Sequence, residues 1–366
     1  MITAHKPALP YDPADEEFEK DEAETTRELI ETMRDIQQKV LDDSGHAERS
    51  VHTKSYGILE GEVKVFDDLL PMYAQGVFQP GATYPAVLRI SAIPGDILPD
   101  EITAPRGLSL KLFGVEGARL EGSEGDTTQD FVMVNGHHFQ TPTAKAFLAN
   151  LKLLEKTTDG VEGVKKAASV VNRALEQVLE AFGGESANLK GLGGAPMTHP
   201  LGDSFYSQSA FRYGDHVAKF AVAPVDPALV ALHDKPVDIK GRDNGYRELV
   251  MEHIAAHGGE WDIRVQLRTD RDMPIEDASK DWSQDDSPYV PVARITVKPQ
   301  PGWSEARSKT VDDGYAFSVW HGVEAHRPLG RINRVRKDNY KAAAEFRGRA
   351  NGCPMHEPRS WQGLPG

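Results

Sequence analysis

The stretch NRVRKDNYKAAAEFR, from Asn333 to Arg347, is the most informative part of the sequence. It predicts a helix, because alanine and long charged side chains dominate it. Pro and Gly are absent until Gly348, and a glycine at that place is suited to end the helix. Arg336, Tyr340 and Arg347 stand at i−4, i and i+7, so all three share one face. The helix therefore presents a tyrosine between two arginines.

On the residues alone, Tyr340 has two interpretations. In the first, the stretch is an amphipathic C-terminal helix, and Tyr340 packs against the body of the protein. In the second, the ionised phenol is a ligand to ferric haem, because a neighbouring guanidinium stabilises the phenolate. The helix alone leaves both interpretations open.

The composition excludes several classes of protein. The 366 residues carry a formal net charge of −14, which disfavours a nucleic-acid binder because nothing would neutralise a phosphate backbone. The single cysteine, Cys353, excludes a disulfide framework and a cysteine-rich zinc site, and its thiol is interpreted as incidental. No stretch approaches the ~20 apolar residues of a membrane span, and no apolar signal segment is visible. We expect a cytoplasmic protein.

Apolar periodicity predicts an α+β fold built on an antiparallel sheet or barrel. Strands are expected at 58–66, 86–92, 106–115, 130–135, 209–224, 260–268 and 289–299. Helices are expected at 16–43, 143–156, 161–182 and 246–257, with a glycine-rich connector at 190–195. These are about seven strands in two groups, without the strict β–α alternation of a doubly wound parallel sheet.

Thirteen histidines are candidates for metal or acid–base chemistry. His-Glu-x-x-His does not occur, and the neighbours His137 and His138 would point to opposite faces of a strand. A Ser/His/Asp hydrolase is disfavoured because no Gly-x-Ser-x-Gly elbow appears. His52 differs, since Arg49 stands three residues before it and a glycine-containing strand follows it. Taken alone, Arg49, His52 and Arg89 would be ordinary surface residues.

Together, five ordered segments resemble the catalase family, in particular its smaller bacterial catalase-like haem proteins. RSVHTKSYG at 49–57 is similar to the family's Arg-x-x-His segment, which carries the distal histidine. PAVLRISA at 85–92 and APRGLSLKL at 104–112 are similar to its Arg-Phe-Ser and Asp-Pro-Arg-Gly-Phe-Ala-Val-Lys-Phe strands. PYVPVARITV at 288–297 looks like the barrel strand that precedes the proximal region.

The fifth segment is the predicted helix around Tyr340. Its pattern Arg336-x-x-x-Tyr340-(six residues)-Arg347 reproduces the spacing of the family's proximal ligand helix, with one arginine before and one after. The resemblance spans roughly residues 45–350, and five segments in order are far less expected by chance than any single motif. It favours Tyr340 as an iron ligand.

The resemblance implies a role for each matching residue. Tyr340 would be the axial ligand of haem b, and Arg336 would stabilise its phenolate. His52 would transfer protons on the distal face, with Ser91 hydrogen-bonded to the back of its ring. Phe131 or Phe139 would form an aromatic wall above the haem. Forked guanidinium groups suit the haem propionates, and those implied here belong to Arg49, Arg89 and Arg347.

Two features depart from the family pattern. The distal asparagine is missing, and Thr128 or Gln129 stands near its place, with Thr128 as the candidate catalytic residue. Losing an amide that positions peroxide is expected to weaken dismutation. In addition, the stretch 321–330 differs from the long loop of large catalases, and His321 and His326 within it are rival iron ligands. They are disfavoured because neither has an arginine at helical spacing on each side, and because a Pro- and Gly-containing turn follows them.

The sequence thus predicts a catalase-like antiparallel β-barrel with flanking helices, and haem b buried between the barrel and the C-terminal helix. The expected division is an N-terminal arm and helix (1–44), a haem-binding domain (45–350) and a tail (351–366). The expected activity is of catalase or peroxidase type, on hydrogen peroxide or organic hydroperoxides, with homo-oligomerisation left open. The alternatives are a fatty-acid hydroperoxide isomerase or peroxygenase, a non-catalytic haem carrier or sensor, and an α+β domain without haem.

Overall fold

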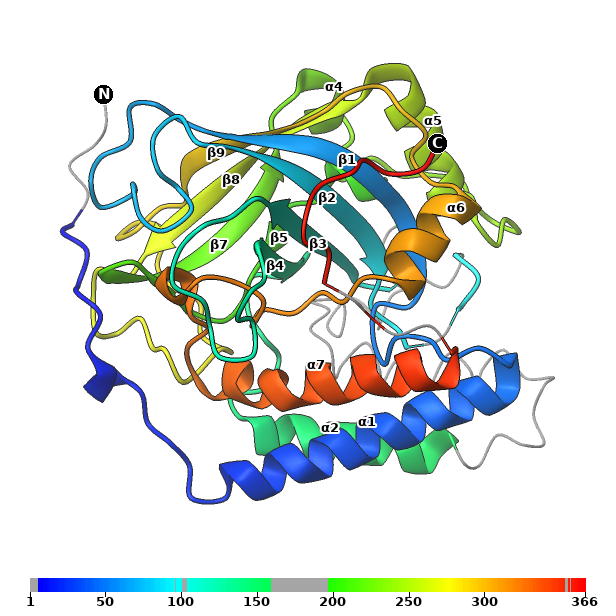
Figure 1. Cartoon of the computed structure of the whole chain (residues 1–366), viewed down its shortest axis with the longest axis horizontal. Helices are drawn as coiled ribbons and strands as arrows, with labels where there is room; N and C mark the ends of the chain where they lie inside the picture. The colour runs from blue at the N-terminus through cyan, green and yellow to red at the C-terminus, as the bar shows by residue number, and fades with distance from the viewer. Residues whose placement is uncertain (1–5, 96, 101–103, 159–196, 353–354, 356) are drawn as a thin grey trace.

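An antiparallel β-barrel is the centre of the computed structural model, which describes residues 6–95, 97–100, 104–158, 197–352, 355 and 357–366 (Figure 1). Its nine strands follow the order β5-β4-β3-β2-β1-β9-β8-β7-β6, and an additional pairing of β5 with β7 closes all but β6 into a ring. The expected antiparallel barrel is therefore confirmed. The strands are β1 (Ser55–Val65), β2 (Thr83–Ala92), β3 (Arg106–Phe113), β4 (Thr128–Val134), β5 (Phe205–Tyr206), β6 (Phe211–Tyr213), β7 (His216–Pro224), β8 (Gly259–Leu267) and β9 (Val290–Val297).

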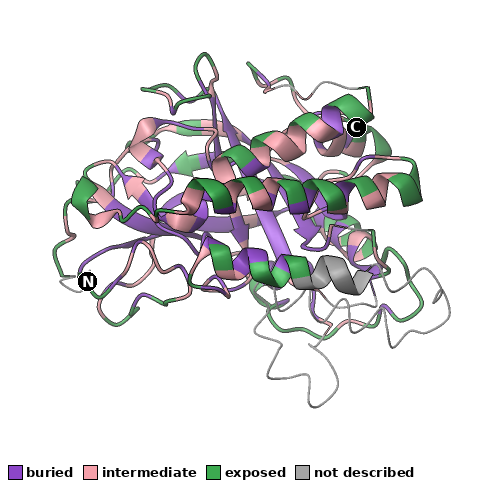
Figure 2. Cartoon of the chain, turned by 90° about the horizontal axis from the view of Figure 1, so that it is seen from below, coloured by how far each residue is buried: buried purple, intermediate pink, exposed green. Residues whose placement is uncertain are grey.

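Three long helices form a layer beside the barrel. They are α1 (Glu22–Ser44), α2 (Ala144–Thr158) and α7 (Arg331–Ala350), which run side by side in Figure 1. Figure 2 shows this layer from its outer side, with exposed residues on the helices and the buried strands behind them. The helices hold together through an apolar cluster that includes Leu29, Met33, Phe147, Leu151 and Val335.

Shorter elements complete the fold. Within the described residues, the remaining α-helices are α4 (Pro227–Val230), α5 (Gly245–His257) and α6 (Glu305–Ser308). Short 3-10 helices lie at Pro13–Asp15, Pro200–Gly202 and Glu324–His326, and a π-helical turn follows α6 at Lys309–Asp313. None of the helices within the described residues is both long enough and apolar enough to cross a membrane.

Strand alternation decides which side chains of the barrel face the helix layer. On β2, Leu88 belongs to the apolar core inside the barrel, so its neighbour Arg89 points outward. The strand register places Arg89 opposite Ser109 of β3, and Ser109 opposite Val132 of β4. These three side chains form a strip across neighbouring strands, on the side of the barrel that faces α7.

The predicted strands and helices within the described residues all correspond to observed elements, but several differ in detail. Helix α1 begins at Glu22 rather than at residue 16. The stretch 209–224, predicted as one strand, forms β6 and β7, which turn at Gly214 with a φ of 61°. The two-residue strand β5 was not predicted, because so short a segment carries no periodicity. The predicted helix 161–182, the connector 190–195 and Cys353 lie outside the described residues.

Helix α7 is longer at both ends than the sequence predicts. It begins at Arg331, and Asn333 lies buried within it rather than at its start. It also continues through Gly348 to Ala350. A glycine ends a helix where it takes the left-handed conformation, and Gly348 is not among the glycines with positive φ.

Ion pairs fix a different face of α7 from the one that carries Tyr340. Arg334 lies 2.8 Å from carboxylate oxygens of both Glu22 and Glu276, and Arg331 lies 2.7 Å from Glu19. These contacts tie α7 to the start of α1 and to the segment between β8 and β9. The face with Tyr340 is thereby held toward the barrel.

Candidate active site

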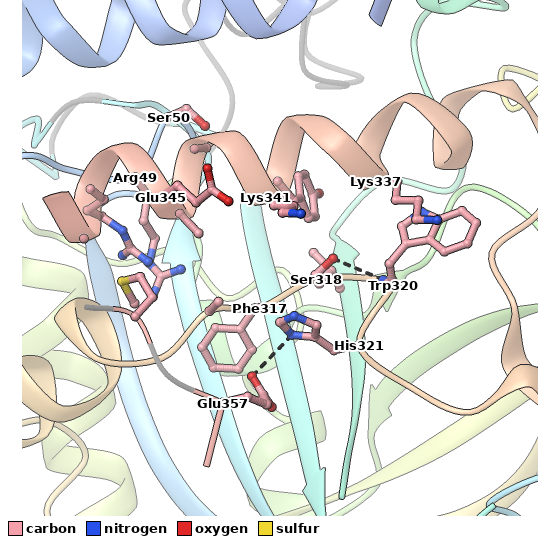
Figure 3. Close-up of a pocket in the computed structure, with 18 of the residues that line it drawn as sticks. Arg49, Ser50, Phe317, Ser318, Trp320, His321, Lys337, Lys341, Glu345 and Glu357 are labelled. Carbon is pink, nitrogen blue, oxygen red and sulfur yellow. Dashed lines mark hydrogen bonds and ion pairs between the residues drawn. The ribbon is translucent and has the colours of Figure 1, made fainter. Parts of the chain in front are cut away.

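A cavity of about 1010 Å³ lies between α7 and the outer face of strands β2 to β4 (Figure 3). Its walls come from α1, the segment before β1, the three strands, the connection between β3 and β4, α7 and the segments on either side of α7. The structure thus gathers residues from distant parts of the sequence around one cavity. Five of the predicted site residues line it, namely Arg49, His52, Arg89, Tyr340 and Arg347.

His52 is held tightly in the cavity wall. Its backbone takes the left-handed conformation, with a φ of 60°, which is strained for a residue other than glycine. The ring nitrogen Nδ1 lies 3.2 Å from Oγ of Ser91. Across the strand register from Ser91 stands Gly107, where an added Cβ would lie 2.2 Å from Cε1 of His52. A residue with a side chain at position 107 would therefore overlap the His52 ring, and glycine leaves room for it.

The surroundings of His52 keep its ring neutral. Burial, followed by the positive charges of Arg89, Arg336 and Arg49, lowers the pKa of His52 from 6.5 to about 3. A neutral imidazole has one nitrogen that donates a hydrogen bond and one that accepts. With Nδ1 beside the Ser91 hydroxyl, Nε2 is the nitrogen left to exchange a proton with a molecule in the cavity.

Three arginines of the cavity converge on the π-helical turn Lys309–Asp313. Nε of Arg89 lies 2.5 Å from Oδ1 of Asp312. Arg49 donates to three backbone carbonyls between residues 311 and 315, at 2.9 to 3.0 Å. Arg347, on α7, donates to two of the same carbonyls. Asp312 is the carboxylate that contacts this group directly.

The arginine group carries positive charge that is incompletely neutralised. Burial and the charges of the other two arginines hold the pKa of Arg49 well below its ordinary value. Burial and Arg89 lower the pKa of Arg347 to about 10. Burial would raise the pKa of Asp312, but Arg89 and Arg49 keep it below its ordinary value. Nε of Arg49 is buried without a hydrogen-bond partner among the described residues, so this wall suits an anionic ligand.

The α7 wall of the cavity includes Tyr340 and Arg347. It also includes five further charged residues, Lys337, Asp338, Lys341, Glu345 and Arg349. Ala343, Ala344 and Gly348 line the cavity as well, so this wall combines small and charged side chains. Arg336 does not line the cavity. Its guanidinium donates to Oδ1 of Asn333 at 3.1 Å and lies 5.7 Å from the centre of the Phe139 ring.

Neither candidate for the aromatic wall lines the cavity. Phe131 points into the barrel, where its ring centre lies 4.8 Å from that of Phe220. The next residue on β4, Val132, lines the cavity instead, because neighbouring strand residues face opposite sides. Phe139 packs within the helix layer, with its ring centre 5.3 Å from that of Phe147.

The residues at the place of the missing distal amide also have other partners. The hydroxyl of Thr128 is buried and donates to Glu357. The amide nitrogen of Gln129 donates to the carbonyl of Asp130, and its oxygen accepts from the backbone N–H of Val323 at 3.0 Å. Neither side chain is placed to substitute for that amide in the cavity.

The structure separates the two rival histidines. His326 lies inside the barrel, where its Nε2 accepts from the backbone N–H of Val77 at 3.0 Å and burial lowers its pKa to about 3. His321 lines the cavity. Among the described residues, no three His, Cys, Asp or Glu side chains are grouped so as to hold a metal ion.

Sequence reasoning missed Asp312, which contacts Arg89 without lining the cavity, and several residues that do line it. Asp312 lies in a polar stretch with no periodicity, and Ser109 carries no signal apart from its strand position. Glu357 lies after the end of α7, in a C-terminal segment without periodicity. Only the tertiary course of that segment brings its side chain to the cavity. Trp320 also lines the cavity. Strand alternation could have found Ser109, since it predicts which residues share the face of Arg89.

Comparison with known proteins identifies the fold. The chain aligns with the structure of a fungal catalase with a TM-score of 0.58, at 15% sequence identity, over 87% of this chain and 63% of that one. The fold is catalase-like. Catalase A from Saccharomyces cerevisiae aligns with a TM-score of 0.53, at 16% identity, over 87% of this chain and 66% of that one. The predicted catalase-like barrel with flanking helices is confirmed.

The two structural alignments cover only part of each catalase. The chain covers slightly less than two thirds of the length of either catalase. No protein-family model matches the chain, and no curated protein sequence matches it. At this level of identity the likeness establishes the fold, and function has to be argued from the cavity.

Proposed function

We propose that this protein is a haem b enzyme that acts on hydrogen peroxide or organic hydroperoxides. In this proposal Tyr340 is the axial ligand and His52 transfers protons on the distal side. The observation that supports it most is the convergence of Tyr340, His52 and three arginines on one cavity of a catalase-like fold. The function and the roles of these residues come from the resemblance described for the sequence.

The cavity fits the cofactor in charge and in size. Haem b carries two propionates. The group of Arg49, Arg89 and Arg347 offers three guanidinium groups, and Asp312 is the carboxylate paired with it among the described residues. The unpartnered Nε of Arg49 gives a buried donor for one of the propionates. The volume of about 1010 Å³ lies at the upper end of the range of about 300–1,000 Å³ usual for ligand sites. When bound, haem would supply the iron centre for cleavage of the peroxide O–O bond.

The chain's own residues would bind, orient and move protons. Tyr340 would hold the cofactor from α7, while Arg49, Arg89 and Arg347 would hold its propionates. His52 is neutral and can accept a proton at Nε2. A proton taken up there could later be returned to a leaving oxygen. Ser91 fixes the orientation of the ring, and Gly107 leaves space for it.

The lack of a free distal amide favours peroxidase-type turnover over efficient dismutation. Thr128 and Gln129 make their hydrogen bonds elsewhere, so peroxide has fewer groups to orient it. The lining also includes charged residues such as Glu121, Glu124 and Lys337. These favour a small polar peroxide over a fatty acyl chain, which would need an apolar channel.

The test is the absorption spectrum after titration with haemin, for the wild type and for Tyr340→Phe. We expect a Soret band in the wild type that collapses or shifts in Tyr340→Phe. The matched control is Tyr84→Phe. This substitution also removes a phenolic hydroxyl, but Tyr84 does not line the cavity. A wild type without a Soret band would refute the proposal. A Soret band in Tyr340→Phe that is identical to that of the wild type would indicate that His321, and not Tyr340, is the iron ligand.

A further inference from the structure

Four charged or titratable side chains form a cluster on the cavity wall. Nζ of Lys111 lies 2.7 Å from Oδ1 of Asp130 and also contacts Glu357. Nδ1 of His321 lies 3.3 Å from Oδ2 of Asp130 and 3.3 Å from Oε2 of Glu357. Lys111 and Asp130 have no exposed surface, whereas His321 and Glu357 line the cavity. The buried pair therefore stands behind a histidine and a carboxylate that reach the cavity.

Three separate parts of the chain build this cluster. Lys111 on β3 and Asp130 on β4 are register partners, so both side chains leave the barrel on the same face. His321 comes from the segment before α7. Glu357 comes from the C-terminal segment, which Figure 1 shows in red crossing the barrel strands. That segment is anchored by Trp361, whose ring centre lies 4.9 Å from that of Phe113.

The charges of the cluster support one another. Burial would lower the pKa of Lys111, but Asp130 and Glu357 hold it above its ordinary value. Burial would raise the pKa of Asp130, yet Lys111 and His321 hold it below its ordinary value. Oδ2 of Asp130 also accepts from the backbone N–H of Ser318 at 3.0 Å. Asp130 is therefore a fixed carboxylate behind the histidine.

The two carboxylates determine how the ring of His321 can act. Because the Asp130 carboxylate beside Nδ1 is an acceptor, we assign the proton of the neutral ring to Nδ1, which donates to Oδ2 of Asp130. Nε2 is then the nitrogen that remains to exchange a proton. Figure 3 shows the ring with Glu357 on the side away from α7. An imidazole backed by a carboxylate is a common arrangement for a general base.

We propose that His321 is a second acid–base residue of this cavity, with Asp130 and Glu357 as the residues that position it. This inference rests on the proposed function and adds a chain-specific group to it. When a hydroperoxide ROOH binds, its O–H bond breaks and an N–H bond forms at Nε2 of His321. The electron pair stays on the oxygen, and the proton is later returned to the leaving alkoxide or hydroxide oxygen. No oxidant or reductant is consumed in the transfer.

The two histidines of the cavity have opposite surroundings. His52 is surrounded by arginines, whose charge opposes a proton on its ring. His321 instead contacts two carboxylates, which also contact Lys111. A cavity without a free distal amide would thus have a second group that can hold the proton of a peroxide.

The test compares His321→Gln with the wild type after haemin titration. We expect kcat/KM for hydrogen peroxide to fall at least about 100-fold, since general acid–base catalysis contributes about 10²–10⁴. The Soret band and the haemin affinity should stay unchanged, and free imidazole should restore part of the rate in His321→Gly. Glu357→Gln should lose less, about 10-fold, because Asp130 still holds the ring.

The control is His138→Gln, which removes a histidine that lies 3.3 Å from a carboxylate, that of Asp281, but does not line the cavity. It should match the wild type. Turnover within about twofold of the wild type in His321→Gln would overturn this inference and leave the proposed function standing. Loss of haemin binding in His321→Gln would also overturn it, because His321 would then be a ligand or a structural residue. A wild type that binds no haemin would overturn the proposed function, and this inference with it.

Discussion

Replacing Gly107 by alanine tests whether the position of His52 matters. The new methyl group would lie 2.2 Å from Cε1 and 2.5 Å from Nδ1 of the ring. Since carbon atoms pack at about 3.5–4.0 Å, the ring has to move by about 1.3 Å or more. The ring cannot move that far and keep its contact with Ser91, 3.2 Å from Nδ1.

The expected cost has two parts. Forcing one extra methyl group into a packed site costs about 1–3 kcal/mol. Losing the contact between His52 and Ser91 costs about 1 kcal/mol more, the net value of a typical hydrogen bond. The free energy of unfolding should therefore fall by about 2–4 kcal/mol. Because a displacement of 1 Å in a reacting group can cost about 100-fold, kcat/KM for peroxide should fall by a similar factor.

The free energy of unfolding is measured by urea titration, and kcat/KM on protein loaded with haemin. Gly61→Ala is the control, because its added methyl group would lie 3.2 Å from its nearest neighbour and does not approach His52. It should cost less stability and leave turnover unchanged. A Gly107→Ala protein with stability within about 0.5 kcal/mol of the wild type and with normal turnover would refute the assigned role of His52.

Two other changes probe the cavity. In His52→Gln, kcat/KM should fall about 100-fold or more while the Soret band is retained, and an unchanged rate would indicate a haem carrier. In Asp312→Asn, the arginines lose the carboxylate that contacts them, so urea titration should show a loss of about 3–5 kcal/mol; a loss no larger than in Asp313→Asn would contradict the reasoning. The pKa of Asp312 is lowered in the folded state, so its stabilisation is present above the unfolded pKa of about 3.9 and is lost as pH falls through the folded value. Asp312→Asn should flatten this acidic part of the pH–stability curve.

Much of the fold could be predicted because periodicity records which side of an element is buried. Strand alternation separates Leu88 from Arg89, and helical spacing places Tyr340 and Arg347 on one face of α7. The closure of the barrel could not be predicted in the same way. It depends on β5, which is two residues long and pairs with both β4 and β7.

The candidate site was predictable where residues match a spaced motif and unpredictable where tertiary contacts decide. Arg49, His52 and Arg89 were found through the resemblance, since nothing local indicates that they meet. Phe131 was one of the two candidates for the aromatic wall, yet Val132 lines the cavity, because neighbouring residues of a strand face opposite sides of the sheet. Asp312 has no local signal, since its importance arises from the three arginines around it.

The walls of the cavity come from segments on both sides of the barrel strands, and this sets an order of assembly. Strand β1 pairs with β9, so the barrel cannot close until residue 297 is available. Gln37 of α1 lines the cavity, but α1 packs against α7, which follows β9. A ribosome-bound chain that ends before residue 340 would therefore lack the cavity. A cofactor would then bind only after most of the chain has been synthesised. It would contact both segments that are synthesised early and segments that are synthesised late.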